Sequence, residues 1–122
     1  MELDIREALR YLGVRGEPGA ELARQVRQVA AQLTETLSPR YVYRVFDLER
    51  TDKGFALAGT DAVLTGATAA KMLAGSHRAA VLACTLGARF DQLLRATQAR
   101  DMAQAVILDA CGGALVEAGC DA

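Results

Sequence analysis

The sequence is poor in several residue types that define specialised protein classes. Its 122 residues include no tryptophan, two prolines, one histidine and three cysteines. No stretch approaches the about 18 to 20 uninterrupted apolar residues that a membrane-spanning helix needs. The N-terminus carries charges at Glu2, Asp4 and Arg6, where a secretory signal peptide would be apolar. We therefore expect a cytoplasmic protein that does not associate with a membrane.

Neither sign of charge is in excess. Fourteen Lys and Arg residues stand against fifteen Asp and Glu residues, which gives a formal net charge of −1. Such a balance creates no broad positive field for a polyanion. Nucleic acid is therefore not an expected partner, and the Arg and Tyr residues that alternate over residues 40–44 are interpreted as one polar face of a sheet.

Metal-ligand patterns are missing as well. The single histidine, His77, is not flanked by a cluster of cysteine or acidic residues. The cysteines, Cys84, Cys111 and Cys120, form no Cys-x-x-Cys pair and match no zinc-binding spacing. Each lies in an apolar run, where a small buried side chain fits. We expect three structural thiols and no metal site.

The length fits a single domain over residues 1–122, and the 52% hydrophobic fraction is enough for one core. Apolar residues at helical spacing predict a first helix over residues 4–12. Asp4 is its expected N-cap. Glu7 follows three residues later, which comes close to the pattern of a capping box. A second amphipathic helix is predicted from residue 22 to residue 37, where a Ser-Pro pair ends it.

The middle of the chain predicts strands. Residues 41–48 and 55–58 are rich in aromatic, β-branched and other apolar side chains, and a turn at 52–54 joins them into an antiparallel hairpin. Residues 63–64 add a short third strand. This hairpin interrupts the helical pattern, so a strictly alternating parallel sheet is not expected.

Helices dominate again after the hairpin. A short helix is predicted over residues 67–73, then a strand over 79–84 whose consecutive apolar residues indicate that both faces are covered. A helix through residues 90–97 follows, and a last helix begins at Asp101, which can cap it. The predicted fold is α+β, with an antiparallel or mixed sheet, helices packed around it, and the order α-α-β-β-(β)-α-β-α-α.

Glycines mark two places where a ligand or another segment can approach the backbone. Residues 85–87, Thr-Leu-Gly, join a strand to a helix, where free N–H groups can hold a phosphate or carboxylate. They match no nucleotide-binding pattern, so a bend that simply needs glycine is the favoured interpretation. Gly112 and Gly113 lie inside the last helix and together cost about 1 to 2 kcal/mol relative to two alanines. We expect tight backbone packing or ligand approach there.

Acidic side chains are the main candidates for binding. Glu117 and Asp121 are four residues apart and share one helix face, and Asp109 lies on a similar side. Two carboxylates on one face can receive an ammonium group or ribose hydroxyls. A solvated surface pair is the commoner arrangement, because Asp and Glu are rarely buried. The residues by themselves thus predict no complete active site and no catalytic residue.

Four sequence blocks cover nearly the whole chain. They are EALRYLGVRG at residues 7–16, PRYVYRVF at 39–46, LACTLG at 82–87, and a last block that runs from LDAC at 108–111 to VEA at 116–118 and CDA at 120–122. In this order and spacing they resemble the small stand-alone proteins related to the activation domain of vitamin B12-dependent methionine synthase.

The resemblance implies a domain that binds S-adenosylmethionine and presents it to a corrinoid on a methyltransferase or corrinoid-binding protein. In that scheme cob(II)alamin is reductively remethylated, with an electron from a flavodoxin or ferredoxin. The protein places the sulfonium methyl group over the cobalt and excludes competing ligands. The family's last helix carries an acid-Ala-x-x-acid pattern, which Glu117, Ala118 and Asp121 repeat. These two acids are the implied contacts to the ligand's ammonium or ribose.

The sequence lacks the family's Arg-x-x-x-Gly-Tyr loop, which lies after the last helix in that family. The chain is therefore expected to be the N-terminal portion of a longer activation-domain-like protein and to be incomplete alone. One alternative is a docking module for a corrinoid protein or methyltransferase that does not use S-adenosylmethionine. The other is a self-associating fragment, in which an exposed apolar stripe forms a homodimer through Met102, Val106, Val116 and Cys120.

Overall fold

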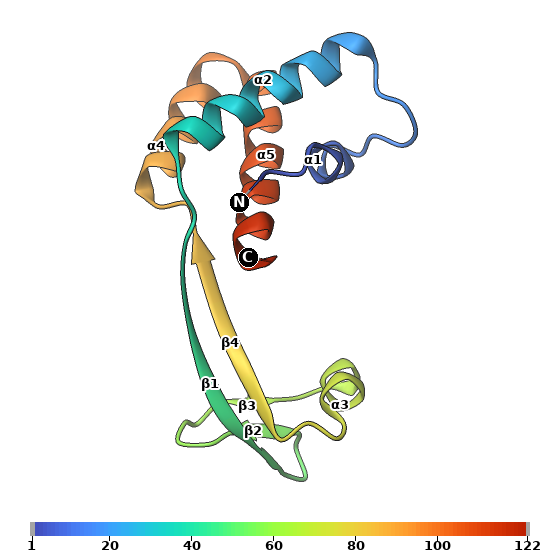
Figure 1. The fold of residues 1–122 in the computed structure, drawn as a ribbon, viewed down its shortest axis with the longest axis vertical. Helices are drawn as coiled ribbons and strands as arrows, with labels where there is room; N and C mark the ends of the chain where they lie inside the picture. Colours follow the sequence, from blue (N-terminus) through green and yellow to red (C-terminus); the bar gives the residue numbers. More distant parts are fainter. Residues whose placement is uncertain (1, 122) are drawn as a thin grey trace. The chain divides into compact units, whose positions relative to one another are not determined.

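The computed structural model describes residues 2–121 and has the predicted α+β fold (Figure 1). Its elements in chain order are α1 (Ile5–Tyr11), α2 (Ala20–Thr36), β1 (Arg40–Arg50), β2 (Phe55–Leu57), β3 (Val63–Leu64), α3 (Ala67–Leu73), β4 (Arg78–Thr85), α4 (Ala88–Arg100) and α5 (Met102–Asp121). The predicted order of helices and strands is confirmed. Contacts divide the chain into two compact units: a sheet unit, Val42–Ala83, and a helical unit formed by the residues on either side of it.

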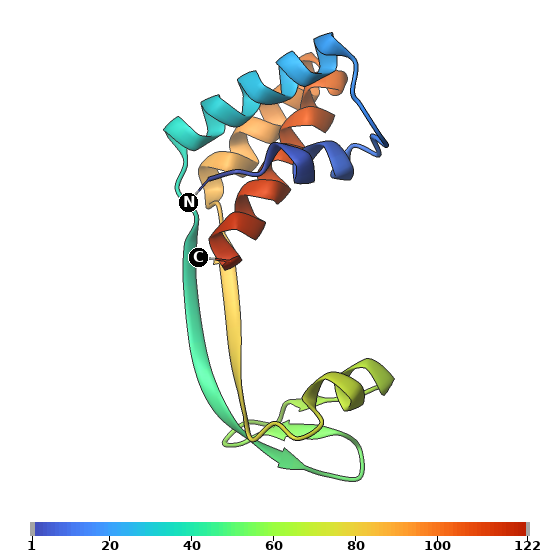
Figure 2. The same cartoon turned by 45° about the vertical axis from the view of Figure 1, so that its right-hand side comes forward.

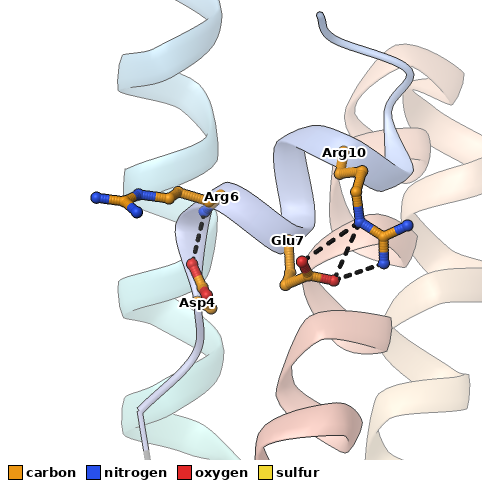
Figure 3. Close-up of polar contacts among 4 residues, drawn as sticks. All are labelled: Asp4, Arg6, Glu7 and Arg10. Carbon is orange, nitrogen blue, oxygen red and sulfur yellow. Dashed lines mark hydrogen bonds and ion pairs between the residues drawn. The ribbon is translucent and has the colours of Figure 1, made fainter.

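Asp4 and Glu7 organise the start of α1 (Figure 3). The Asp4 carboxylate accepts a hydrogen bond from the Arg6 backbone N–H at 2.9 Å, which satisfies one unpaired donor of the first turn. The Glu7 carboxylate instead accepts hydrogen bonds from the Arg10 guanidinium, whose Nη2 lies 2.7 Å from Oε2. Asp4 is thus the predicted N-cap, and Glu7 forms an ion pair one turn along the helix.

Helix α5 is the centre of the helical unit, because α1, α2 and α4 all pack against it (Figure 1). Its start follows the prediction, since the Asp101 carboxylate accepts a hydrogen bond from the Gln104 backbone N–H at 3.2 Å. Neighbouring helices on several sides bury more than a single stripe. The buried residues are Ala105, Ile107, Leu108, Ala110, Cys111, Gly112, Ala114, Leu115 and Gly119.

The apolar composition of α5 is also compatible with a membrane-spanning helix. By length and hydropathy alone α5 could cross a membrane, and half of its most apolar window is buried inside the protein. A helix that packs against three others needs apolar residues on most sides. Its place in the core therefore accounts for this composition.

Cys111 lies at the contact between α5 and α2. It is fully buried, as are Val26 and Leu33 of α2, and its thiol donates a hydrogen bond to the Val26 carbonyl at 3.8 Å. Burial disfavours the thiolate and raises the pKa of Cys111 to about 11. The predicted structural role is confirmed for this cysteine.

The sheet unit contains the predicted antiparallel hairpin. β1 pairs with β2 in a register that sets Leu48 opposite Leu57, and β2 pairs in turn with β3. The sheet order is β3-β2-β1-β4. Gly54 closes the turn with a φ of +147°, and a Cβ there would overlap the Leu64 carbonyl, so this position requires glycine. Helix α3 packs against β2 (Figure 2).

Strand β4 differs from its prediction in one respect. The apolar run does form a strand, but its side chains are mostly exposed, with Val81 at 46% and Leu82 at 40%. The expectation that both faces are covered is therefore wrong for this chain. β4 is an outer strand of the sheet. A consecutive apolar run favours a strand, but what covers that strand depends on segments remote in the sequence.

The raised pKa of Cys111 predicts a pH-dependent loss of stability. The stabilisation from keeping the thiol protonated is complete below the unfolded-state pKa near 9 and is lost as the pH rises toward 11. Over that window the free energy of unfolding should fall by up to about 2 to 3 kcal/mol more in the parent than in Cys111→Ala. Urea denaturation of both proteins at several pH values measures this difference. Parallel pH profiles would contradict the buried, protonated thiol.

Candidate functional site

A cleft of about 510 Å³ lies beside α5 within the helical unit. Its size falls in the range of small-molecule binding sites. The end of α1, the turn after β4, the start of α4 and one side of α5 all contribute to its lining. The lining includes Tyr11, Cys84, Thr85, Gly87, Phe90, Asp91, Val106, Asp109, Gly112, Gly113 and Val116.

Two glycines of α5 form the floor of the cleft. A Cβ at Gly112 would overlap the Phe90 ring of α4, so that ring lies directly on the helix backbone. A Cβ at Gly113 would lie 3.4 Å from Cε2 of Tyr11, which is an ordinary packing distance. The expected tight packing at the glycine pair is therefore confirmed for Gly112, and its partner is an aromatic side chain.

The Tyr11 ring at the cleft is held by local contacts. The Arg10 guanidinium lies 5.1 Å from the ring centroid, within the range of a cation–π interaction. Arg10 is itself held by Glu7 (Figure 3), and this ion pair raises the pKa of the guanidinium. The charge of Arg10 is thus engaged by Glu7 and by the ring, and Arg10 is not a lining residue.

The turn at residues 85–87 forms one end of the cleft. Gly87 has a φ of +84° and precedes α4, and its backbone N–H donates to the Thr85 hydroxyl at 3.0 Å. The prediction of a bend that requires glycine is confirmed by this backbone conformation. The first N–H groups of α4 have no partner within the helix, and Phe90 and Asp91 of this first turn line the cleft.

Two carboxylates line the cleft from different helices. Asp91 belongs to the first turn of α4, where negative charge is favourable, and Asp109 belongs to α5. Asp109 is among the acids that the sequence predicts for binding, whereas Asp91 is not. An acid in the first turn of a helix is common for electrostatic reasons alone, so no local signal distinguishes Asp91.

The predicted binding residues, Glu117 and Asp121, lie on a neighbouring side of α5. Both are exposed, and they line a separate depression of about 380 Å³ together with Glu2, Asp4 and Glu7. Neither lines the larger cleft. The structure therefore brings Glu117 and Asp121 together with each other and with the acidic N-terminal segment, but it places Asp109 elsewhere.

The cysteines do not share one environment. Cys111 is buried, Cys84 is half-buried at the edge of the cleft, and Cys120 is exposed, which is contrary to the expectation of three buried thiols. Loss of solvent around its thiol raises the pKa of Cys120, with smaller effects from Cys84 and from the nearby acids.

Residues 2–121 contain no group of three His, Cys, Asp or Glu side chains that could hold a metal ion. His77 lies in the sheet unit, where its backbone carbonyl accepts a hydrogen bond from Leu48 N–H at 2.8 Å. The side chain is exposed. The cleft beside α5 is therefore the candidate functional site.

No protein-family model matches this sequence, and no curated protein matches it at a significant level. The resemblance to the activation domain of methionine synthase therefore stays a prediction.

The glycine floor can be tested with a matched pair of substitutions. Gly112→Ala should destabilise the protein by about 1 to 2 kcal/mol, because overpacking against Phe90 outweighs the gain in helix propensity. Gly113→Ala should be neutral or up to about 1 kcal/mol stabilising, because its new methyl group has room. Chemical denaturation measures both. Phe90→Leu in the Gly112→Ala background should recover part of the loss, and equal effects of the two alanines would refute the packing.

Proposed function

We propose that this chain binds S-adenosylmethionine beside α5 and supports reductive remethylation of a corrinoid held by a cytoplasmic methyltransferase or corrinoid-binding protein. The observation that carries the proposal is the cleft of the helical unit. It combines apolar and aromatic walls, two carboxylates and the start of a helix around one cavity. Together with the four resembling sequence blocks, this lining supports an adenosyl ligand with positive charge.

Each part of S-adenosylmethionine can be assigned a suitable group of the lining. Its adenine is flat and mostly apolar, and Phe90, Val106 and Val116 supply apolar surface. Its sulfonium group is a cation, for which Asp91 and Asp109 are suitable partners. Its carboxylate suits the N–H groups at the start of α4. These complementary pairs exist within one cleft of suitable size.

Glu117 and Asp121 remain part of the proposal as contacts to the ligand's ammonium group or ribose. Glu117 follows Val116, which lines the cleft, although Glu117 itself lies on the next face of α5. A ligand that extends from the cleft along α5 would reach this face. The acid-Ala-x-x-acid pattern of the resembling family supports the same pair.

The corrinoid of the partner supplies the methyl-accepting cobalt, and a flavodoxin or ferredoxin supplies the electron. The role of this chain is to hold the sulfonium methyl group at a fixed position and to keep water and other ligands away. The sequence has no Arg-x-x-x-Gly-Tyr motif. The proposal therefore includes a further loop with this motif, from additional polypeptide, that completes the site.

Exposed apolar side chains favour a second candidate function. Met102 is 60% exposed and Val106 is 53% exposed on α5, and Cys120 of the same predicted stripe is exposed too. Such a stripe suits either a docking module for a corrinoid protein or a homodimer. Sedimentation at increasing concentration distinguishes the two, because a chain that stays monomeric contradicts the homodimer.

Titration of the 15N-labelled chain with S-adenosylmethionine tests the proposed function. Because the site lacks its further loop, we expect weak binding, with a Kd of about 1 mM, or roughly 4 kcal/mol. Amide shift changes should concentrate at residues 85–91 and 106–117 and should leave the sheet unit unchanged. ATP is the control, since it carries the same adenosine with negative charge, and it should bind less well. Unchanged spectra at saturating ligand would refute the proposal.

A further inference from the structure

We infer that Asp91 and Asp109 form a cation-selecting subsite in the cleft, so that its ligand carries a positive charge joined to a flat or apolar group. This inference rests on the proposed function where it names the ligand. For S-adenosylmethionine it means that the cleft recognises the sulfonium charge and discriminates against the neutral thioether of S-adenosylhomocysteine.

The positions of the two carboxylates depend on one packing contact. Asp91 follows Phe90, whose ring lies on the backbone of Gly112, and Asp109 precedes Gly112 by three residues, or about one helical turn. The contact that joins α4 to α5 therefore lies next to one acid and one helical turn from the other, and both acids are exposed. Both carboxylates line the same cavity. Two acids carried by packed helices can approach one bound cation without a change in the backbone, which lowers the ordering cost of binding.

The cleft holds no basic side chain that would neutralise this pair. None of its lining residues is a lysine or arginine. Arg95 approaches Asp91 through its Nε, but it donates to the backbone carbonyl at 3.4 Å. The two ion pairs of the described chain join Arg10 to Glu7 and Arg24 to Glu21. Neither Asp91 nor Asp109 belongs to an ion pair of the described residues, so a ligand cation would meet two carboxylates without such a partner.

The rest of the lining indicates an organic cation. No three His, Cys, Asp or Glu side chains within residues 2–121 are placed to hold a metal ion together, although Cys84 lines the same cleft as the two carboxylates. Phe90 and Tyr11 present aromatic groups, and Val106 presents an exposed apolar side chain in the same cavity. Sulfonium and quaternary ammonium groups are weakly hydrated, and aromatic groups attract them as well.

Charge selection by the cleft is tested by comparing the Kd values of S-adenosylmethionine and S-adenosylhomocysteine in NMR titrations at low ionic strength. The sulfonium ligand should bind the parent chain about three- to tenfold more tightly, and added salt should reduce this ratio. Asp109→Asn and Asp91→Asn should each bring the ratio close to one. Thermal unfolding of each variant verifies that the fold is retained.

Two control variants separate charge selection from other effects. Glu117→Gln should weaken both adenosyl ligands equally, because both carry the ammonium group, and should leave the ratio unchanged. Asp61→Asn, in the sheet unit, should change neither Kd. Equal affinity of the parent for both ligands would overturn the inference while leaving the proposed function intact.

A second probe keeps the inference testable if neither adenosyl ligand binds, a result that would refute the proposed function. Benzyltrimethylammonium should then shift the amides around the cleft in the parent and much less in Asp109→Asn. Benzyl alcohol, its neutral counterpart, should cause smaller shifts in both proteins. A response to benzyltrimethylammonium that is absent, or that is unchanged by Asp109→Asn, would overturn the cation-selecting subsite.

Discussion

The contact between the Phe90 ring and the bare backbone of Gly112 is the constraint on which the helical unit depends. It brings α4 so close to the middle of α5 that any side chain at position 112 would force the Phe90 ring to shift. Glycine inside a helix costs about 1 kcal/mol relative to alanine. Burial of a large part of an aromatic ring offsets this cost, since a fully buried Phe is worth about 1.5 to 3 kcal/mol.

The same contact creates the concave surface beside it. With Phe90 on one side and Tyr11 on the other, the glycine pair leaves a section of α5 that no side chain of its own covers. A helix normally presents side chains all round, so a cavity against a helix usually needs small residues at its floor. Here two adjacent glycines provide that floor, while acids on α4 and α5 lie at its edges.

Local sequence signals predicted the parts of the structure that depend on neighbouring residues. The Asp4 and Asp101 caps, the Gly87 bend and the hairpin closed by Gly54 all follow from backbone chemistry over a few residues. Close packing at Gly112 and Gly113 was also predictable, because two glycines inside a helix lower its stability relative to alanines and something must offset that loss. The identity of the packing partner, Phe90, was not, because it depends on how two helices meet.

Features set by remote segments were not predictable. The exposure of Val81 and Leu82, the place of Asp91 in the cleft, and the separation of Asp109 from Glu117 all depend on which surfaces meet in three dimensions. A helical repeat relates residues eight apart only approximately, so the neighbours of α5 decide which of its acids share a surface. Of the acids of α5 that the sequence singled out, Asp109 lines the cleft, whereas Glu117 and Asp121 line a separate depression.

The central position of α5 also has a consequence for how the protein is made. On the ribosome, α1 and α2 emerge long before the helix against which both of them pack, and the whole sheet unit is synthesised in between. Until residues 102–121 are synthesised, the apolar sides of those first two helices can contact only each other and solvent. Their nascent form is therefore exposed to misassociation for most of translation, a risk shared by chains whose contacts join distant segments.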